Sequence, residues 1–222
     1  MKKLFAILMS VLMIACFMPT MAFADGEGSP ATGEATETYV AQVGETQYET
    51  LQKAIDAATG ETTTVELLAN TTEDITIPAG KKVTLNLNGK TLTNSSSDTI
   101  TVANGAELTI EGTGTVDNVT HAKAALVNYG TAVLKGGTYT RSKEDADNNK
   151  GSAGKNSFYT ILNDKGGNMT IQNGVEVTNV GHFSSMIRNG GDGQSQAVSK
   201  LQINGGTFSG GINTVKNDEY GE

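Results

Sequence analysis

The sequence predicts an all-β solenoid, a fold in which the chain winds into stacked coils of short strands. One phrase recurs along the chain: an apolar residue, Asn, one or more Gly, and then alternating apolar residues that run into a second Gly-rich step. Copies begin at Val102, Val127, Leu162 and Ile187, and a degenerate copy begins at Ile77. The apolar residues of each copy alternate with period two, which is typical of strands with one buried face. Such self-similarity indicates that each copy is one layer of a stack.

Residues 1–24 are predicted to be a secretory signal. Lys2 and Lys3 supply the positive charge, residues 4–17 form the apolar run, and residues 22–24 (Ala-Phe-Ala) form an A-x-A cleavage site. The signal predicts a secreted or cell-surface protein, with no membrane association after the signal is cleaved.

Cys16 is the only cysteine of the chain and lies inside this signal. Cleavage after Ala24 would leave a mature protein without a thiol, which excludes disulfides, Cys-ligated zinc and thiol catalysis. The alternative is that Cys16 is a lipidation site, since Ile14-Ala15-Cys16 weakly resembles a lipobox.

The mature chain is expected to be strongly acidic. The signal contains two of the 16 basic residues and none of the 24 acidic ones, so 24 acids face 16 − 2 = 14 bases and the net charge is −10. This excess disfavours binding to nucleic acid or to anionic lipid. Residues 25–38 contain no apolar residue larger than Ala and are predicted to be a flexible acidic linker.

Residues 39–70 are predicted to form an N-terminal cap of a strand and an amphipathic helix, and residues 71–222 the coils. The helix is expected at residues 48–58, where Leu51, Ala54, Ile55 and Ala58 follow the spacing i, i+3, i+4, i+7. It is expected to cover the open end of the first coil, whose backbone groups and core aliphatics would otherwise be exposed.

Each coil is predicted to contain a strand, a tight turn and the return of an apolar residue. The strands are marked by apolar residues two apart: Val83-Leu85-Leu87, Leu108-Ile110, Ala132-Leu134, Met169-Ile171 and Leu201-Ile203. The turns are expected to need positive φ at a column of small or Asn residues: Gly89, Gly112, Gly136, Asn173 and Gly205. The returning apolar residues are Leu92, Val116, Tyr139, Val177 and Phe208.

A column of asparagines gives a second register mark. Its members are Asn104, Asn128, Asn163, Asn189 and Asn217. Asn side chains at equivalent turns can hydrogen-bond from one coil to the next, so a ladder of stacked amides is expected. The unequal spacing of these residues predicts insertions at 141–156 and at 191–199.

These features resemble the right-handed parallel β-helix of the pectate-lyase-like superfamily, over residues 40–222. The resemblance depends on the Asn and Gly columns, on residues 50–58 (TLQKAIDAA) and on residues 75–92 (ITIPAGKKVTLNLNGKTL). The last segment is also similar to repeats in surface proteins of Gram-positive bacteria. The resemblance implies a right-handed solenoid with a short N-terminal capping helix. Leucine-rich repeats and propellers fit less well, since no L-x-x-L-x-L phrase, even spacing or Trp occurs.

A sixth copy of the phrase begins at Val215 and reaches only Glu222. Because solenoids need a polar terminal layer, we expect the coils to be truncated here, with further domains downstream. The alternatives are a flexible tail that covers the stack and a second chain that docks on it.

Four aspartates stand beside predicted turns: Asp98, Asp117, Asp164 and Asp192. In the pectate-lyase-like relatives, aspartates on adjacent coils hold calcium and an arginine abstracts the substrate proton. Here no column repeats Asp in successive coils, and the two arginines, Arg141 and Arg188, lie outside acidic phrases. Solvated turn residues are therefore predicted in place of a calcium site.

Other catalytic patterns are incomplete. A polygalacturonase-like site would need paired carboxylates and a Gly-His-Gly phrase, but His182 is followed by Phe183, and Asp145 and Asp147 lie in the predicted insertion. His182 and His121 have no Cys, Asp or His at a fixed spacing, so surface or structural roles are predicted. The sequence accordingly predicts no catalytic, cofactor-binding or metal-ligating residue, and no cofactor.

Sugar rings stack on exposed aromatic side chains, so the rings are the candidates for glycan contact. Phe158 and Tyr159 at the insertion, and the pair Tyr129 and Tyr139, are the rings expected near the surface. Any of them could instead cover the core.

The predicted function is that of a non-catalytic secreted or surface-displayed bacterial β-helix protein, a stalk or adhesin-like module that contacts glycans or cell-surface proteins. The alternative is a polysaccharide lyase or glycoside hydrolase whose site lies in later coils, which only the analogy of fold supports. A third possibility is a passive repeat domain that precedes a cell-wall anchor.

Overall fold

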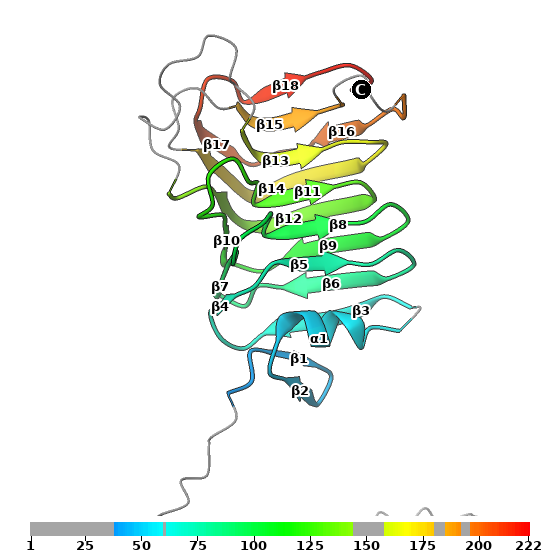
Figure 1. Ribbon diagram of the computed structural model, residues 1–222, viewed down its shortest axis with the longest axis vertical. Helices are drawn as coiled ribbons and strands as arrows, with labels where there is room; N and C mark the ends of the chain where they lie inside the picture. The colour runs from blue at the N-terminus through cyan, green and yellow to red at the C-terminus, as the bar shows by residue number, and fades with distance from the viewer. Residues whose placement is uncertain (1–37, 60, 144–157, 180–184, 192–195) are drawn as a thin grey trace, which may run out of the picture. The chain divides into compact units, whose positions relative to one another are not determined.

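The computed structural model describes residues 38–59, 61–143, 158–179, 185–191 and 196–222 (Figure 1). The predicted signal at 1–24 lies outside these residues, as does the predicted linker at 25–38 except for Thr38. The described chain is all-β, with parallel sheets and one short helix, which confirms the predicted class.

The chain first forms an antiparallel hairpin. β1 (Ala41–Val43) pairs with β2 (Thr46–Tyr48), and its other edge pairs antiparallel with β3 (Thr63–Leu67). β3 in turn pairs with the next strand of its sheet in parallel. Parallel stacking therefore begins at β3.

The single helix, α1 (Leu51–Asp56), lies between the hairpin and β3. Thr50 caps it, and the Thr50 Oγ1 accepts a hydrogen bond of 3.2 Å from the Lys53 backbone N–H. The predicted apolar stripe is buried: Leu51, Ala54, Ile55 and Ala58. The helix contacts β1, β2, β3 and β5 (Ile75–Ile77). It is shorter than the predicted 48–58, because the chain is still extended in β2 and at Thr50.

From β3 onward each coil supplies strands to three faces. The first face starts with β3 and continues through five parallel strands: β6 (Lys82–Asn86), β9 (Glu107–Glu111), the first part of β12 (Thr131–Thr140), the first part of β14 (Asn168–Asn179) and β16 (Lys200–Ile203). Figure 1 shows these strands stacked one above another.

The second face holds β4 (Thr71–Thr72), β7 (Thr91–Thr93), β10 (Thr115–Asp117), the later parts of β12 and β14, and β17 (Thr207–Gly210). The third face is a six-stranded parallel sheet of β5, β8 (Ile100–Val102), β11 (Leu126–Asn128), β13 (Tyr159–Asn163), β15 (Ser185–Asn189) and β18 (Val215–Asn217). The arrangement is β-helix-like.

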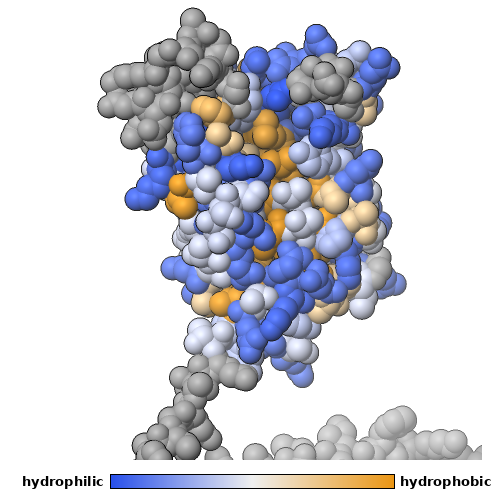
Figure 2. Space-filling model, viewed as in Figure 1, coloured by the Kyte–Doolittle hydropathy of each residue, from blue (hydrophilic) through white to orange (hydrophobic). Residues whose placement is uncertain are grey.

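The core lies between the three faces and consists of columns with one residue from each coil. On the first face, the predicted apolar residues form two columns, one that starts at Val83 and one that starts at Leu85. On the second face, the returning apolar residues form one column that starts at Leu92. The columns are fully buried up to β14 and partly exposed in the last described coil, where Ile203 is 39% exposed. On the outside, polar residues border a band of apolar ones along the middle of the visible face (Figure 2).

The predicted column of positive φ is only partly correct. Gly89 and Gly112 have φ of 71° and 80°, but in the next coil the positive value belongs to Gly137 (88°) and not to Gly136. In the last described coil it belongs to Gly206 and not to Gly205, and Asn173 also lacks it. For Gly136 and Asn173 the reason is that β12 and β14 run unbroken from the first face into the second, with a bulge between Leu134 and Gly136.

Within the described part of the chain, α1 is far too short to cross a membrane and no longer apolar helix accompanies it.

Candidate functional site

The asparagine ladder is present at the corner where the third face ends. Asn128 Nδ2 donates to Asn163 Oδ1 at 2.8 Å, Asn163 Nδ2 to Asn189 Oδ1 at 2.7 Å, and Asn189 Nδ2 to Asn217 Oδ1 at 2.8 Å. The first three side chains are buried; Asn128 and Asn163 also donate to the carbonyls of Gly130 and Gly167 in the adjoining turns, and Asn189 donates to the Glu222 carbonyl of the next coil. The predicted hydrogen bonding between coils is therefore confirmed for these four residues.

The fifth predicted member, Asn104, is not in the ladder. Asn128 pairs with Val102 of β8, so an apolar residue fills the equivalent position one coil earlier. Asn104 lies two residues further on, exposed at the turn. The ladder thus starts at Asn128.

A second column of buried polar residues, which the sequence analysis missed, lies at the corner after the second face. Asn94 Nδ2 donates to Thr120 Oγ1 at 2.7 Å, and Asn118 Nδ2 donates to Thr99 Oγ1 at 3.1 Å and to a backbone carbonyl. Arg141 is the equivalent residue of the next coil. The signal in the sequence is the recurrence of T-L-T-N, T-V-D-N, T-Y-T-R and E-V-T-N from residues 91, 115, 138 and 176.

Both arginines make contacts within the stack of coils. Arg141 is fully buried, its Nε donates to the Lys123 carbonyl at 2.8 Å, and its guanidinium lies 5.7 Å from the Phe158 ring centroid. Arg188 Nε lies 2.9 Å from Asp218 Oδ2, and its guanidinium lies 5.7 Å from the Tyr159 ring centroid.

The aspartates beside turns tie one coil to the next. Asp98 Oδ1 accepts from the Ala124 backbone N–H at 2.7 Å, and Asp117 accepts from Ser142 through the backbone N–H at 2.9 Å and through the hydroxyl at 2.5 Å. Asp164 accepts locally, from the Lys165 N–H at 2.6 Å.

Asp74, which the sequence analysis did not single out, accepts more inter-coil hydrogen bonds than Asp98 or Asp117. It accepts from the backbone N–H groups of Ser95, Ser96 and Ser97, at 2.8 to 3.2 Å, and from the Ser96 hydroxyl. Burial raises the pKa of Asp74, but these hydrogen bonds outweigh burial and hold the pKa below its usual range.

The described residues hold no group of three or more His, Cys, Asp or Glu close enough to share a metal ion. His121 is exposed and its ring lies edge-on to Phe158, with centroids 4.8 Å apart. His182, Asp192, Asp145 and Asp147 lie outside the described residues.

Of the four candidate rings, Tyr129 is partly exposed and borders a hollow. Tyr139 belongs to the core, where its hydroxyl donates to the Gly136 carbonyl at 3.2 Å and burial raises its pKa. Tyr159 is 4% exposed. Phe158 is partly exposed but packs against His121 and Arg141. The expectation of surface rings is therefore wrong for Tyr139 and Tyr159.

The hollow beside Tyr129 arises from a difference in turn length. Four residues connect the third face to the first at 78–81, 103–106 and 164–167, and each of these turns has Gly at its third position with φ between 80° and 87°. Only two residues, Tyr129 and Gly130, make the same connection between β11 and β12. The short turn is set back between its longer neighbours, and we call the resulting hollow the notch.

Asn128 holds the short turn in place. Its Oδ1 accepts from the Gly130 N–H, and its Nδ2 donates to the Gly130 carbonyl, both at 3.2 Å. Gly130 has no room for a side chain, because a Cβ would lie 2.5 Å from the carbonyl oxygens of Ala103 and Ala106. The tight approach of the two coils therefore requires glycine here.

The notch has a volume of about 220 Å³ and spans three coils. Its lining residues are Asn104, Gly105, Ala106 and Glu107 from one coil, Tyr129, Gly130 and Thr131 from the next, and Gly166 and Asn168 from the third.

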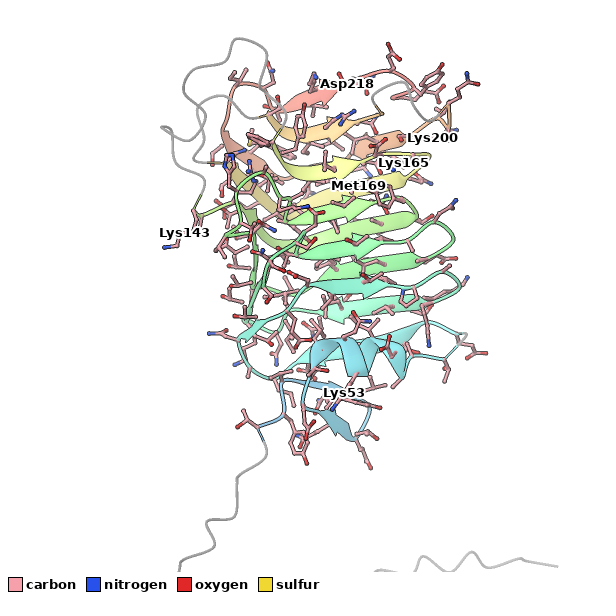
Figure 3. The ribbon with its side chains drawn as sticks, viewed as in Figure 1. Lys53, Lys143, Lys165, Met169, Lys200 and Asp218 are labelled. Carbon is pink, nitrogen blue, oxygen red and sulfur yellow. The ribbon has the colours of Figure 1, made fainter. Side chains whose placement is uncertain are left out.

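Charged groups surround the notch without filling it. Lys165 Nζ lies 5.1 Å from the Tyr129 ring centroid, and Glu107 forms a 2.8 Å ion pair with Lys82. Burial raises the pKa of Tyr129, and the negative charges of Asp164 and Asp98 raise it further, so the phenol stays protonated at neutral pH. Figure 3 shows Lys165 below Lys200 at the same edge of the stack.

Comparisons of the chain with protein-family models, with curated proteins and with solved structures gave no match in any of the three.

Proposed function

We propose that this chain is a non-catalytic module of a secreted or surface-displayed bacterial protein, which acts as a rigid stalk or adhesin-like element and contacts glycans or cell-surface proteins. The proposal includes a right-handed parallel β-helix of the pectate-lyase-like type, with α1 and the β1–β2 hairpin covering its first coil.

The observation that carries the proposal is that, among the described residues, three aspartates and both arginines are engaged in contacts within the stack of coils. Asp74, Asp98 and Asp117 each accept hydrogen bonds from the following coil, which holds successive turns in register. Arg141 is buried and Arg188 is paired with Asp218. A general acid or base needs access to substrate and a pKa near the working pH, and these side chains are committed to other contacts.

A stiff stack of coils is suited to the role of a stalk that holds a binding surface away from the cell. Every coil is joined to its neighbours by backbone ladders on three faces, and the Asn128–Asn217 ladder adds side-chain bonds along one corner. Connections at the corners accept extra residues without disturbing the strands, as at 141–158 and 190–199.

Binding without turnover tests this function. The purified chain is incubated with insoluble peptidoglycan, mucin and pectin, and both the bound fraction and the soluble products are measured. We expect retention on at least one of these glycans with no new reducing ends and no unsaturated uronate.

Product that disappears in an Asp98→Asn, Asp164→Asn double variant would establish the competing function, a lyase or hydrolase. The absence of retention on every glycan would remove the glycan-contacting role.

Secretion is tested separately. The intact mass and first residue of the protein recovered from the culture medium of its native cell should place the N-terminus at Asp25. A lipid-modified Cys16 at the N-terminus would contradict the proposed processing and support a lipid anchor instead.

A further inference from the structure

We propose that the notch is a binding site for one pyranose ring of an uncharged glycan, with Tyr129 as the stacking surface and Lys165 as a side chain that moves aside on binding. This proposal rests on the proposed glycan-contacting function and assigns it to a specific place.

The notch differs from every neighbouring position along its corner. The turns at 103–106 and 164–167 project on either side of it, and the turn at 129–130 is two residues shorter. The hollow therefore has a floor and two walls from three successive coils, which lie about 4.8 Å apart in a parallel sheet. A volume of about 220 Å³ is below the usual size of a drug-like pocket and suits a single small ring.

The floor offers an aromatic face. The Tyr129 ring is partly exposed and borders the hollow, and its neighbour Gly130 carries no side chain to cover it. The C–H groups on one face of a pyranose pack against such a ring, whose face is electron-rich.

The walls offer hydrogen-bonding groups at different heights. Asn104 and Asn168, on opposite walls, each provide an amide that both donates and accepts, and Thr131 adds a hydroxyl between them. Asn104 and Asn168 are exposed, so their amides are open to a ligand. Sugar hydroxyls need partners of both kinds, and these groups supply them around the ring.

The surrounding charge favours an uncharged ligand. The carboxylates of Asp164 and Asp98 both act on the Tyr129 phenol, and Glu107 lines the notch itself. The Lys82–Glu107 pair neutralises one of these charges, and Lys165 adds one positive charge beside the Tyr129 ring. An acidic sugar would meet this carboxylate field and the negative net charge of the chain, which is −8 for the full sequence.

The position of Lys165 leads to a specific prediction about sugar binding. Its ammonium lies 5.1 Å from the Tyr129 ring centroid, the distance of a cation–π contact, and the side chain itself is exposed. A sugar that stacks on this ring competes with that contact, so removal of the lysine should strengthen binding.

The test is a titration followed by NMR on ¹³C-labelled tyrosine rings, with methyl β-glucopyranoside, methyl β-galactopyranoside and N-acetylglucosamine as probes. Sorbitol, which carries hydroxyls but no pyranose ring, serves as the matched probe control. We expect saturable shifts of the Tyr129 ring signals with at least one pyranoside and none with sorbitol.

Three variants define the site, and their affinities are compared by saturation-transfer difference NMR on the sugar signals, which does not need the Tyr129 ring as a reporter. Tyr129→Ala should lose binding by about tenfold or more. Lys165→Ala should bind about threefold more tightly, because the cation–π competitor is gone. Replacement of Tyr129 and Gly130 by the four-residue turn Ala-Asn-Gly-Gly keeps glycine before Thr131, where a Cβ has no room. This replacement should fill the notch and abolish binding while the thermal unfolding midpoint stays near that of the parent.

The outcomes separate this proposal from the function it rests on. If the chain is retained on an insoluble glycan equally well with and without Tyr129, the notch is not the site although the glycan-contacting function stands. If no pyranoside shifts the Tyr129 signals, or sorbitol shifts them equally, the notch proposal is overturned. Weaker binding by Lys165→Ala would contradict the role given to Lys165.

Discussion

The buried asparagine side chains at the corner of the third face each form hydrogen bonds to more than one coil. Asn163 donates to Asn189 and accepts from Asn128, and it also donates to the carbonyls of Gly167 and Lys200. A buried polar group that loses its partner pays the full cost of desolvation. Each ladder asparagine is therefore a structural requirement of the coils on both sides of it.

Asn163→Ala is expected to lower the free energy of unfolding by about 1–3 kcal/mol, because the change leaves groups of Asn128 and Asn189 without their partner. The matched control is Asn104→Ala, which removes an exposed asparagine outside the ladder and should change stability by less than about 0.5 kcal/mol. Urea unfolding of both variants measures the difference. Equal effects would mean that the ladder adds no stability of its own.

Asp74 is expected to make stability depend on pH in the acid range. Its folded pKa is held below the unfolded value by hydrogen bonds from Ser95, Ser96 and Ser97. The contribution of Asp74 to the free energy of unfolding is thus complete above its unfolded pKa and is lost as the pH falls through its folded pKa. The stability difference between the parent and Asp74→Asn should accordingly shrink as the pH is lowered. A difference that stays constant from neutral pH to the acid range would contradict this assignment.

The sequence predicts these residue contacts only in part. Period and spacing locate Asn128, Asn163, Asn189 and Asn217, but they also select Asn104, since a repeat phrase does not reveal a shift of two residues within a turn. The expectation for Tyr139 failed for a different reason. Tyr139 follows the same alternation as Val116 and Val177, and whether a large residue at such a position faces inward depends on the register of its neighbours.

At the scale of elements, the helix and the strands were predictable because one period governs each. Period 3.6 marks the buried stripe of α1, and period two marks the inward positions of β6, β9 and β16. The corners were less predictable. A Gly-Gly pair such as Gly136-Gly137 suits either a turn or a bulge inside a continuous strand, and the pairing of β12 with β14 selects the bulge.

Ile55→Ala in α1 should destabilise the chain by about 2–5 kcal/mol, because Ile55 is fully buried in the core and the change opens a cavity there. Lys53→Ala, on the exposed side of the same helix, removes only the ion pair with Glu49 and serves as the control, with little change expected. Thermal unfolding followed by circular dichroism measures both. A small effect of Ile55→Ala would show that α1 separates from the coils without cost.

At the scale of the whole described chain, stability is expected to vary along the stack. Each coil contacts only its neighbours, so a coil in the middle is supported on both sides. Leu134 of β12 is fully buried, whereas Ile203 in the equivalent position of β16 is 39% exposed. The last described coil has lost part of the burial that holds the central ones.

Amide hydrogen exchange should reveal this gradient. We expect the slowest exchange in β9 and β12 and faster exchange in β16, β17 and β18, because protection follows local burial and contact density. Mass-spectrometric exchange on peptic peptides resolves these strands. Uniform protection from β9 to β18 would indicate one cooperative unit and would contradict the expected gradient.

The short turn at Tyr129 and Gly130 has a consequence for how such a chain can change over generations. A recess made by substitution alone requires several large side chains to be replaced by small ones. Here a connection two residues shorter, with glycine at position 130, makes the recess, while the strands on either side keep their register. A chain built this way can acquire or erase a recess in a single deletion or insertion, and can place it at any level of the stack.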